Sequence, residues 1–186
     1  MTNVKLPQNI DYTLYYSTSG MSTKHFGPQA WGFLFTSILG HYPVKIVKKN
    51  KEHKKIVLAY YYMLTNLHIT LPCIFCRKSF KQFLKQLPIK PFLNGRIELF
   101  YWLYLMKDKV NKKLIKQEKK LYQSEKTKLT KLYFAQKISK KMYLEQKDNL
   151  KNNIFKTIPT PPFEDVLKQY EKIRATCIKK LKSCSV

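Results

Sequence analysis

The sequence predicts an all-α protein, a bundle of four or five short helices into which a basic helical segment is inserted. Apolar residues recur at the i, i+3, i+4 spacing of one helical face in several stretches of the chain. No stretch alternates apolar and polar residues as a half-buried strand would, and no internal repeat stands out. Hydrophobic residues make up 44% of the 186 residues, which is enough for one domain with its own core.

The first organised segment follows an irregular lead-in over residues 1–24, where Ser, Thr, Gly and Asn are frequent. Its helix should begin near Pro28, because proline suits a first helical turn, and end near Gly40 and Pro43. The inward face is predicted from the residues at helical spacing, which are Trp31, Leu34, Phe35, Ile38 and Leu39.

Three further helices follow, separated by turns. The second spans residues 56–68 and is apolar on nearly all sides, so it should be central. The third begins at the cysteines Cys73 and Cys76 and ends near Leu87. Two prolines and an Asn-Gly turn separate it from the fourth, which spans residues 96–116.

The remaining chain differs in composition. Residues 117–156 are rich in Lys and Gln with loose helical spacing, and they predict one or two weakly amphipathic helices. The three prolines of residues 157–162 form a stiff linker, and a last helix should run from Phe163 to Cys177. The expected domains are the lead-in 1–24, the bundle 25–116, the insertion and linker 117–160, and the closing helix with a cysteine-containing tail 161–186.

The stretch from Leu71 to Arg77 carries the clearest chemistry. Cys73 and Cys76 have the C-x-x-C spacing of a dithiol–disulfide pair. In a first helical turn, Cys76 would meet unpaired N–H groups, the helix dipole and the charge of Arg77. We therefore expect a lowered pKa for Cys76, and we expect Cys73 to be the more exposed of the two.

A structural zinc site is the alternative role for these cysteines. Cys177 and Cys184, or a histidine, would have to complete it, but that second pair is spaced more widely than in zinc knuckles. Redox chemistry is therefore favoured for Cys73 and Cys76, and no metal is expected.

Cys177 and Cys184 are either independent thiols or a pair with a shuttle or structural role. On one continuous helix they would lie about 10 Å apart, which is beyond disulfide reach.

The net charge of +25 is almost entirely lysine, because the chain has only three arginines. Bidentate recognition of bases and phosphates prefers arginine, so the charge favours at most non-specific attraction to nucleic acid. A compositional bias with a solvated surface explains this charge better than nucleic-acid binding does.

Residues 1–16 show no signal peptide, and the apolar run 56–64 is too short to span a membrane. A soluble, cytoplasmic protein is expected.

Four motifs follow one another at specific spacing. They are Phe26-Gly27-Pro28-x-x-Trp31-x-x-Leu34-Phe35, Tyr42-Pro43, Pro72-Cys73-x-x-Cys76-Arg77-x-x-Phe80 and, after Trp102-Leu103, Lys107-Asp108-Lys109-Val110-Asn111-x-x-Leu114-x-Lys116. In this order they resemble the Erv/ALR family of FAD-linked sulfhydryl oxidases. The family's patterns are W-G-P-x-x-W-x-x-L-H, Y-P, P-C-x-x-C-R-x-x-F and W-L followed by H-N-x-V-N-x-x-L-x-K. The resemblance covers residues 25–116 and, more weakly, 161–177.

This resemblance implies a helical bundle that holds FAD, with the isoalloxazine ring beside the cysteine pair. Cys76 then corresponds to the flavin-proximal thiol and Cys73 to the interchange thiol that meets the incoming dithiol. The family's flavin-contact positions fall on Gly27, Trp31, Phe35, Tyr42, Lys107, Val110, Asn111 and Lys116. Without the resemblance, the aromatic residues among them would be assigned to the core.

The chain departs from the family pattern at several of these positions. Phe26 replaces a tryptophan, Phe35 replaces a histidine, and Lys107 with Asp108 replaces a His-Asn pair. Phe35 can keep a ring contact but not a polar one, and Lys107 could pair with the FAD phosphates. The divergence and the composition of an A/T-rich genome are similar to those of members carried by large DNA viruses, which would place the protein in a virion or viral factory.

The sequence therefore predicts an FAD-dependent thiol oxidase. It would form disulfides in protein dithiols, or in a thioredoxin-like carrier, and pass the electrons to O₂, giving H₂O₂. Family members pair through their first two helices, so a homodimer is expected. The alternative, from a different functional class, is a basic module that binds nucleic acid or acidic partners through residues 112–156, with a structural or vestigial C-x-x-C.

Overall fold

The computed structural model describes residues 13, 20–178 and 183–185, with side chains as far as Thr176. The helices are α1 (Thr23–His41), α2 (Lys51–Thr65), the short α3 (Leu67–Thr70), α4 (Ile74–Gln86), α5 (Arg96–Phe134), α6 (Lys140–Ile154) and α7 (Phe163–Glu171). A 3-10 turn, η2 (Lys90–Phe92), precedes α5, and a small hairpin of β1 (Thr176–Ile178) and β2 (Ser183–Ser185) follows α7. The predicted all-α class is confirmed.

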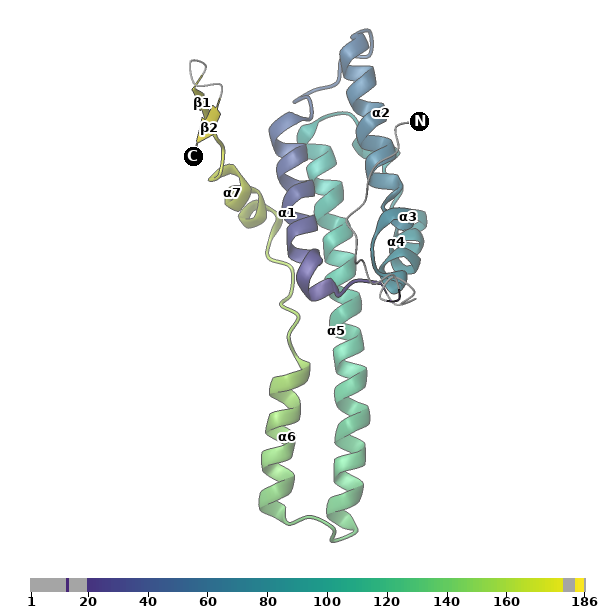
Figure 1. The fold of residues 1–186 in the computed structure, drawn as a ribbon, viewed down its shortest axis with the longest axis vertical. Helices are drawn as coiled ribbons and strands as arrows, with labels where there is room; N and C mark the ends of the chain where they lie inside the picture. The colour runs from purple at the N-terminus through teal and green to yellow at the C-terminus, as the bar shows by residue number, and fades with distance from the viewer. Residues whose placement is uncertain (1–12, 14–19, 179–182, 186) are drawn as a thin grey trace.

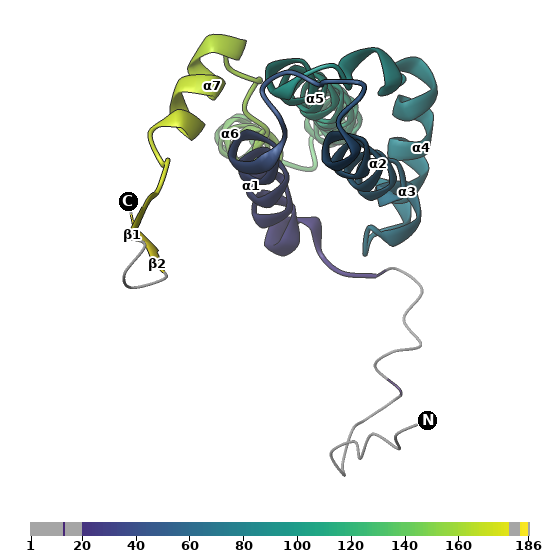
Figure 2. The ribbon, with the colours of Figure 1, turned by 90° about the horizontal axis from the view of Figure 1, so that it is seen from above.

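A helical bundle is formed by α1, α2, α4 and the first half of α5, with α7 on the outer side of α1 (Figures 1 and 2). α5 is the central element, because it contributes more fully buried side chains than any other described helix. The indole of Trp102 donates to the carbonyl of Leu87 at 3.1 Å and so attaches the end of α4 to α5. The largest fully buried side chains are Trp102, Tyr42, Phe35, Phe100, Ile38, Leu64, Leu99, Leu103 and Met106.

Capping residues extend the helices beyond their apolar patterns. The side chain of Asn50 accepts from the backbone N–H groups of Glu52 and His53 at 2.9 and 3.1 Å. This cap starts α2 at Lys51, five residues before the apolar run from which the sequence predicts the helix. α1 also begins early, at Thr23 and without a hydrogen bond from a capping side chain, so Pro28 lies inside the helix rather than at its start.

Aromatic contacts close the bundle through α7. The ring of Tyr170 stacks on Phe35 with centroids 4.9 Å apart, and Phe163 meets Tyr104 at 5.4 Å. The Tyr104 hydroxyl also donates to the carbonyl of Pro161 at 2.9 Å. The chain after the proline linker therefore returns to α1 and α5.

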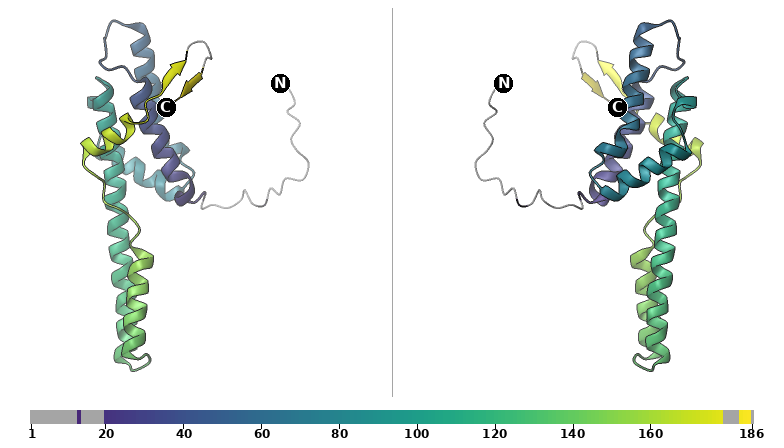
Figure 3. Two further views of the ribbon diagram at one scale, coloured as in Figure 1. Left: turned by 90° about the vertical axis from the view of Figure 1, so that its left-hand side faces the viewer. Right: turned by 90° about the vertical axis from the view of Figure 1, so that its right-hand side faces the viewer.

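α5 is longer than its predicted counterpart, which ended at Lys116. It continues without a break to Phe134, a length of 39 residues. The sequence contains no glycine or proline between Gly95 and Pro159 that would stop it. Its second half packs against α6, and together residues 117–156, here called the arm, project beyond the bundle (Figures 1 and 3).

The predicted last helix is wrong at its C-terminal end. α7 ends at Glu171, where the side chain of Arg174 turns back to pair with the Glu171 carboxylate. The chain then becomes extended, and β1 pairs antiparallel with β2 so that Cys177 lies opposite Cys184 in the backbone register. Their side chains lie outside the described residues, and their role stays a prediction. Among the described residues, no helix combines the length and apolarity needed to cross a bilayer.

Candidate active site

The C-x-x-C motif forms the N-terminal turn of α4, as predicted. Cys73 is the N-cap, with extended backbone angles of −117° and 124°, and its Sγ accepts from the Cys76 N–H at 3.3 Å. Cys76 is the third residue of the helix. Pro72 precedes the cap and cannot continue a helix backwards, so the sulfur of Cys73 satisfies one of the free N–H groups of this turn.

The expectation that Cys73 is the more exposed thiol is wrong. Only 9% of Cys73 is exposed, whereas Cys76 is partly exposed. Two features cover Cys73: its capping role turns the sulfur onto the helix end, and Gly20 packs against its backbone through an antiparallel bridge. This second contact joins residues about fifty positions apart, so no local pattern in the motif predicts it.

The predicted direction of the Cys76 pKa is also wrong. Burial raises the pKa of Cys76, and the Cys73 sulfur adds to this as a hydrogen-bond partner and a nearby charge. For Cys73, burial alone would raise the pKa, but hydrogen bonds from Cys76 and Phe75 and the charge of Arg77 outweigh it and lower the pKa. The cap receives the helix N–H groups, so it is Cys73 that the helix end stabilises as a thiolate.

Two cations lie close enough to act on Cys76. Lys113 of α5 and Arg77 both lower its pKa against the effect of burial. Lys113 Nζ donates to the hydroxyl of Ser79, which lies one turn along α4 from Cys76. The guanidinium of Arg77 donates to the Leu71 carbonyl at 2.7 Å. Sequence reasoning missed Lys113, although it follows Val110 by three residues and so shares a helical face with that predicted contact.

The predicted contacts on α1 have different environments. A Cβ placed at Gly27 would meet no atom within 4 Å, so the space beside this residue is open. Trp31 is partly exposed, whereas Phe35 is fully buried against Phe100 and Tyr170. Lys107 Nζ lies 5.6 Å from the centre of the Phe35 ring, which brings these two predicted residues together.

Tyr42 lies at the opposite end of α1 from Gly27. The separation of 15 residues corresponds to roughly 22 Å of helix. Tyr42 is fully buried, and its hydroxyl donates to the carbonyl of Leu93 at 2.8 Å. Burial, with smaller effects of Glu98 and Tyr60, raises the pKa of this phenol to about 12. Its side chain is thus held in the core, at the end of α1 that lies far from Gly27.

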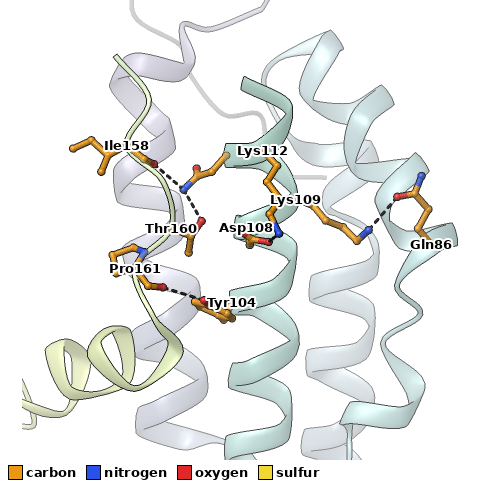
Figure 4. A network of polar contacts seen from close by, with 9 residues as sticks. Gln86, Tyr104, Asp108, Lys109, Lys112, Ile158, Thr160 and Pro161 are labelled. Carbon is orange, nitrogen blue, oxygen red and sulfur yellow. Dashed lines mark hydrogen bonds and ion pairs between the residues drawn. The ribbon is translucent and has the colours of Figure 1, made fainter. Parts of the chain in front are cut away.

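Of the predicted contacts on α5, Asn111 faces the proline linker. The Asn111 amide donates to the Thr160 hydroxyl at 3.0 Å and approaches the Ile158 carbonyl at 3.5 Å (Figure 4). Val110 is partly buried and Lys116 is exposed. On the other side of α5, Lys109 donates to Gln86 of α4 at 3.1 Å (Figure 4). These contacts connect the proline linker to α5 and α5 to the C-terminal end of α4.

Several residues of α1 and α5 fit an anionic cofactor. Burial lowers the pKa of Lys107, and neither Lys107 nor Lys113 takes part in an ion pair within the described residues. The nearest acidic neighbour in sequence, Asp108, is paired with Lys112 at 2.6 Å. Two partly buried, unneutralised ammonium groups suit the diphosphate of FAD, and Trp31 with the open space at Gly27 suits an aromatic ring system.

The described residues contain no group of three or more His, Cys, Asp or Glu side chains arranged to hold a metal ion. The zinc alternative would therefore need ligands from the cysteines whose side chains lie outside the described residues.

A known protein family matches the part of the chain that contains this site. The sequence model of the Erv1 / Alr family matches residues 28–133, which is more than half of the chain. The match includes both cysteines, the first half of α5 and most of its extension into the arm. No curated protein matches the chain at a significant level.

Proposed function

This chain belongs to the Erv1/Alr family of FAD-linked sulfhydryl oxidases, and from that premise we propose that it forms disulfides in protein dithiols and passes the electrons to O₂. The single observation that carries the proposal is the placement of Cys73 and Cys76 at the first turn of α4, where Lys113 of α5 acts on Cys76. Protein dithiols or a thioredoxin-like carrier supply the electrons, and H₂O₂ is the product.

In the first step, a substrate thiolate attacks Cys73 Sγ of the oxidised pair. A mixed disulfide with the substrate forms, the bond between Cys73 and Cys76 breaks, and Cys76 leaves as a thiolate. The second substrate thiolate then attacks the substrate sulfur of the mixed disulfide. This releases the substrate disulfide and a Cys73 thiolate, so two electrons have moved from the substrate to the cysteine pair.

The chain's own residues stabilise the thiolate of Cys73 and partly offset the burial that disfavours the thiolate of Cys76. The Cys76 N–H donates to Cys73 Sγ, and the charges of Lys113 and Arg77 favour the thiolate of Cys76. Bound FAD supplies the redox chemistry that takes the two electrons from the pair and delivers them to O₂. Lys107, Lys113 and Lys116 would hold its phosphates, and Trp31, Val110 and Asn111 would line the ring system beside Cys76.

The proposal is tested by following O₂ during oxidation of dithiothreitol by the purified protein. One H₂O₂ should form for each O₂ consumed and each dithiol oxidised. A protein that contains stoichiometric FAD but does not consume O₂ in the presence of dithiothreitol would contradict the proposal.

A homodimer that pairs through α1 and α2 is part of the same proposal. Phe33 of α1 and Leu58 and Tyr62 of α2 are each more than half exposed, and large apolar side chains on adjacent helices support association. Light scattering at micromolar concentration should give twice the chain mass, and Leu58→Glu should shift the mass toward one chain. A monomeric wild-type mass would contradict this part.

A further inference from the structure

The segment just before α1 lies against the cysteine motif. Gly20 forms an antiparallel bridge with Cys73, and the Met21 N–H donates to the Pro72 carbonyl at 2.9 Å. These are the pairings of two neighbouring β-strands, although neither segment belongs to a sheet. The backbone at Pro72 and Cys73 therefore acts as a short strand edge, and Gly20–Met21 pairs with it.

Glycine is required for this approach. Gly20 has φ of +75°, in the left-handed region that other residues rarely adopt. A Cβ built on Gly20 would lie 1.8 Å from the Pro72 carbonyl oxygen and 3.4 Å from the Cys73 Cα. Even an alanine at this position would force the two segments apart.

This contact conflicts with the chemistry proposed for Cys73. An interchange thiol must be reached by a substrate sulfur, yet Cys73 is only 9% exposed and Gly20 lies directly against its backbone. A protein substrate can therefore reach Cys73 only if the segment 20–21 moves away. When it moves, it uncovers the Pro72 carbonyl, which is an acceptor for the backbone N–H of another chain.

We propose that the Pro72–Cys73 backbone is the binding site for an extended segment of the protein substrate, and that Gly20–Met21 occupies this site in the resting protein. The inference rests on the proposed oxidase function. An extended polypeptide is the ligand class that fits, because it presents the same N–H group that Met21 presents and can add to an exposed strand edge. Such pairing brings a substrate cysteine beside Cys73 in extended conformation.

The proposal predicts that protein dithiols and small dithiols interact differently with the Pro72–Cys73 backbone. A protein dithiol must displace Gly20–Met21 and then gains the backbone pairing itself. A small dithiol such as dithiothreitol has no backbone N–H to offer, so it gains nothing from the vacated edge. Weakening the resting contact should therefore open Cys73 to both kinds of dithiol, whereas removal of one backbone N–H from the peptide should raise KM for the peptide alone.

The test uses two full-length variants at Met21. Met21→Pro removes the N–H that donates to Pro72, whereas Met21→Ala keeps it and serves as the matched control. A second pair is Gly20→Ala against Gly40→Ala, because a Cβ at Gly40 meets no atom within 4 Å. The readouts are the alkylation rate of Cys73, resolved by peptide mass spectrometry on the reduced protein, and KM for a reduced, unstructured peptide that carries two cysteines.

We expect Met21→Pro and Gly20→Ala to raise the alkylation rate of Cys73 by roughly two- to tenfold, the size of one backbone hydrogen bond. KM for the peptide and KM for dithiothreitol should both fall by a similar factor, and both controls should match the wild type. A peptide that is N-methylated beside its first cysteine should have a higher KM than the unmodified peptide, because it lacks the N–H that pairs with Pro72. Unchanged alkylation, or a raised KM of either variant for the unmodified peptide, would overturn the proposal. Faster alkylation of Cys73 with an unchanged KM for the peptide would mean that Gly20–Met21 covers Cys73 but that the Pro72–Cys73 backbone is not the substrate-binding site. The alkylation readout needs no turnover, so failure of the oxidase assignment is recognised separately by the absence of dithiothreitol oxidation.

Discussion

The two halves of α5 have the same conformation but different surroundings. In the first half, Leu99, Phe100, Trp102, Leu103 and Met106 are fully buried in the bundle. In the second half, only Leu129 is buried, and α6 beside it has no buried residue. The arm is held instead by aromatic pairs, such as Tyr133 on Tyr143 at 5.0 Å, and at its base by Glu118, whose carboxylate accepts from the Thr157 N–H and hydroxyl.

This difference shows that a continuous helix need not have one role along its length. The bundle half positions Lys113, which acts on Cys76, whereas most lysines of the arm half are exposed to water. The three arginines of the chain all lie outside the arm, which disfavours specific recognition of nucleic acid there. We propose that the catalytic unit ends near Lys116 and that the arm is an accessory. The predictions below test this division, from the largest expected effect to the smallest.

Removal of the Cys76 thiol alone should abolish the activity of the bundle. Cys76→Ser should lower dithiothreitol oxidation by roughly a thousandfold or more, because the second thiol of the pair is gone, while the fold and bound FAD are kept. Turnover under O₂ and FAD content measure the two effects. Cys184→Ser is the matched control and should oxidise dithiothreitol normally. Full oxidation by the Cys76→Ser protein would exclude Cys76 as the flavin-proximal thiol.

Two leucines on α5 compare the stability of the two regions directly. Leu103 is fully buried and Leu121 is 52% exposed. Leu103→Ala should lower the free energy of unfolding by about 2–5 kcal/mol, because it leaves a cavity in the core. Leu121→Ala should change it by no more than about 0.5 kcal/mol. Urea unfolding followed by circular dichroism measures both, and equal effects would contradict the proposed division.

Lys113 should control the pH dependence of the reaction, and a lysine of the arm should not. Because its charge lowers the pKa of Cys76, Lys113→Met should raise that pKa and reduce the thiolate fraction at neutral pH. The pH profile of dithiothreitol oxidation should then move to higher pH, with part of the activity recovered there. Lys120→Met, on the exposed arm, is the control and should leave the profile unchanged. A loss of activity that is equal at every pH would mean that Lys113 acts on the fold or on FAD binding and not through the pKa of Cys76, and the FAD content of the variant separates these two effects.

Removal of the arm should have the smallest effect. A variant that joins Lys116 to Thr160 through a short Gly/Ser linker keeps the contact between Asn111 and Thr160. We expect FAD content and dithiothreitol oxidation close to those of the full chain. Loss of FAD from this variant would mean that the arm helps to enclose the cofactor, and the boundary at Lys116 would be wrong.

Helical spacing and chain breakers predicted the elements of the bundle well, because the apolar positions of α1, α2 and α5 are a local signal. The helix start at Cys73 and Cys76 was also predictable, because its signal lies within the motif itself. The covering of Cys73 was not predictable, since it depends on the backbone of Gly20, which is distant in sequence. The pKa order of the two thiols depends on which sulfur caps α4, and spacing alone does not determine that. The end of α7 at Glu171 was missed because the apolar spacing continues to Ile173.

Anaerobic reduction of the purified protein by a dithiol tests the central claim most directly. If the cysteine pair of α4 passes electrons to FAD held by α1 and α5, the protein should be yellow. Its visible flavin absorbance should bleach on addition of dithiothreitol without O₂ and return when air is admitted. A yellow protein whose absorbance does not change with dithiothreitol, or a colourless protein that oxidises dithiols, would contradict the account.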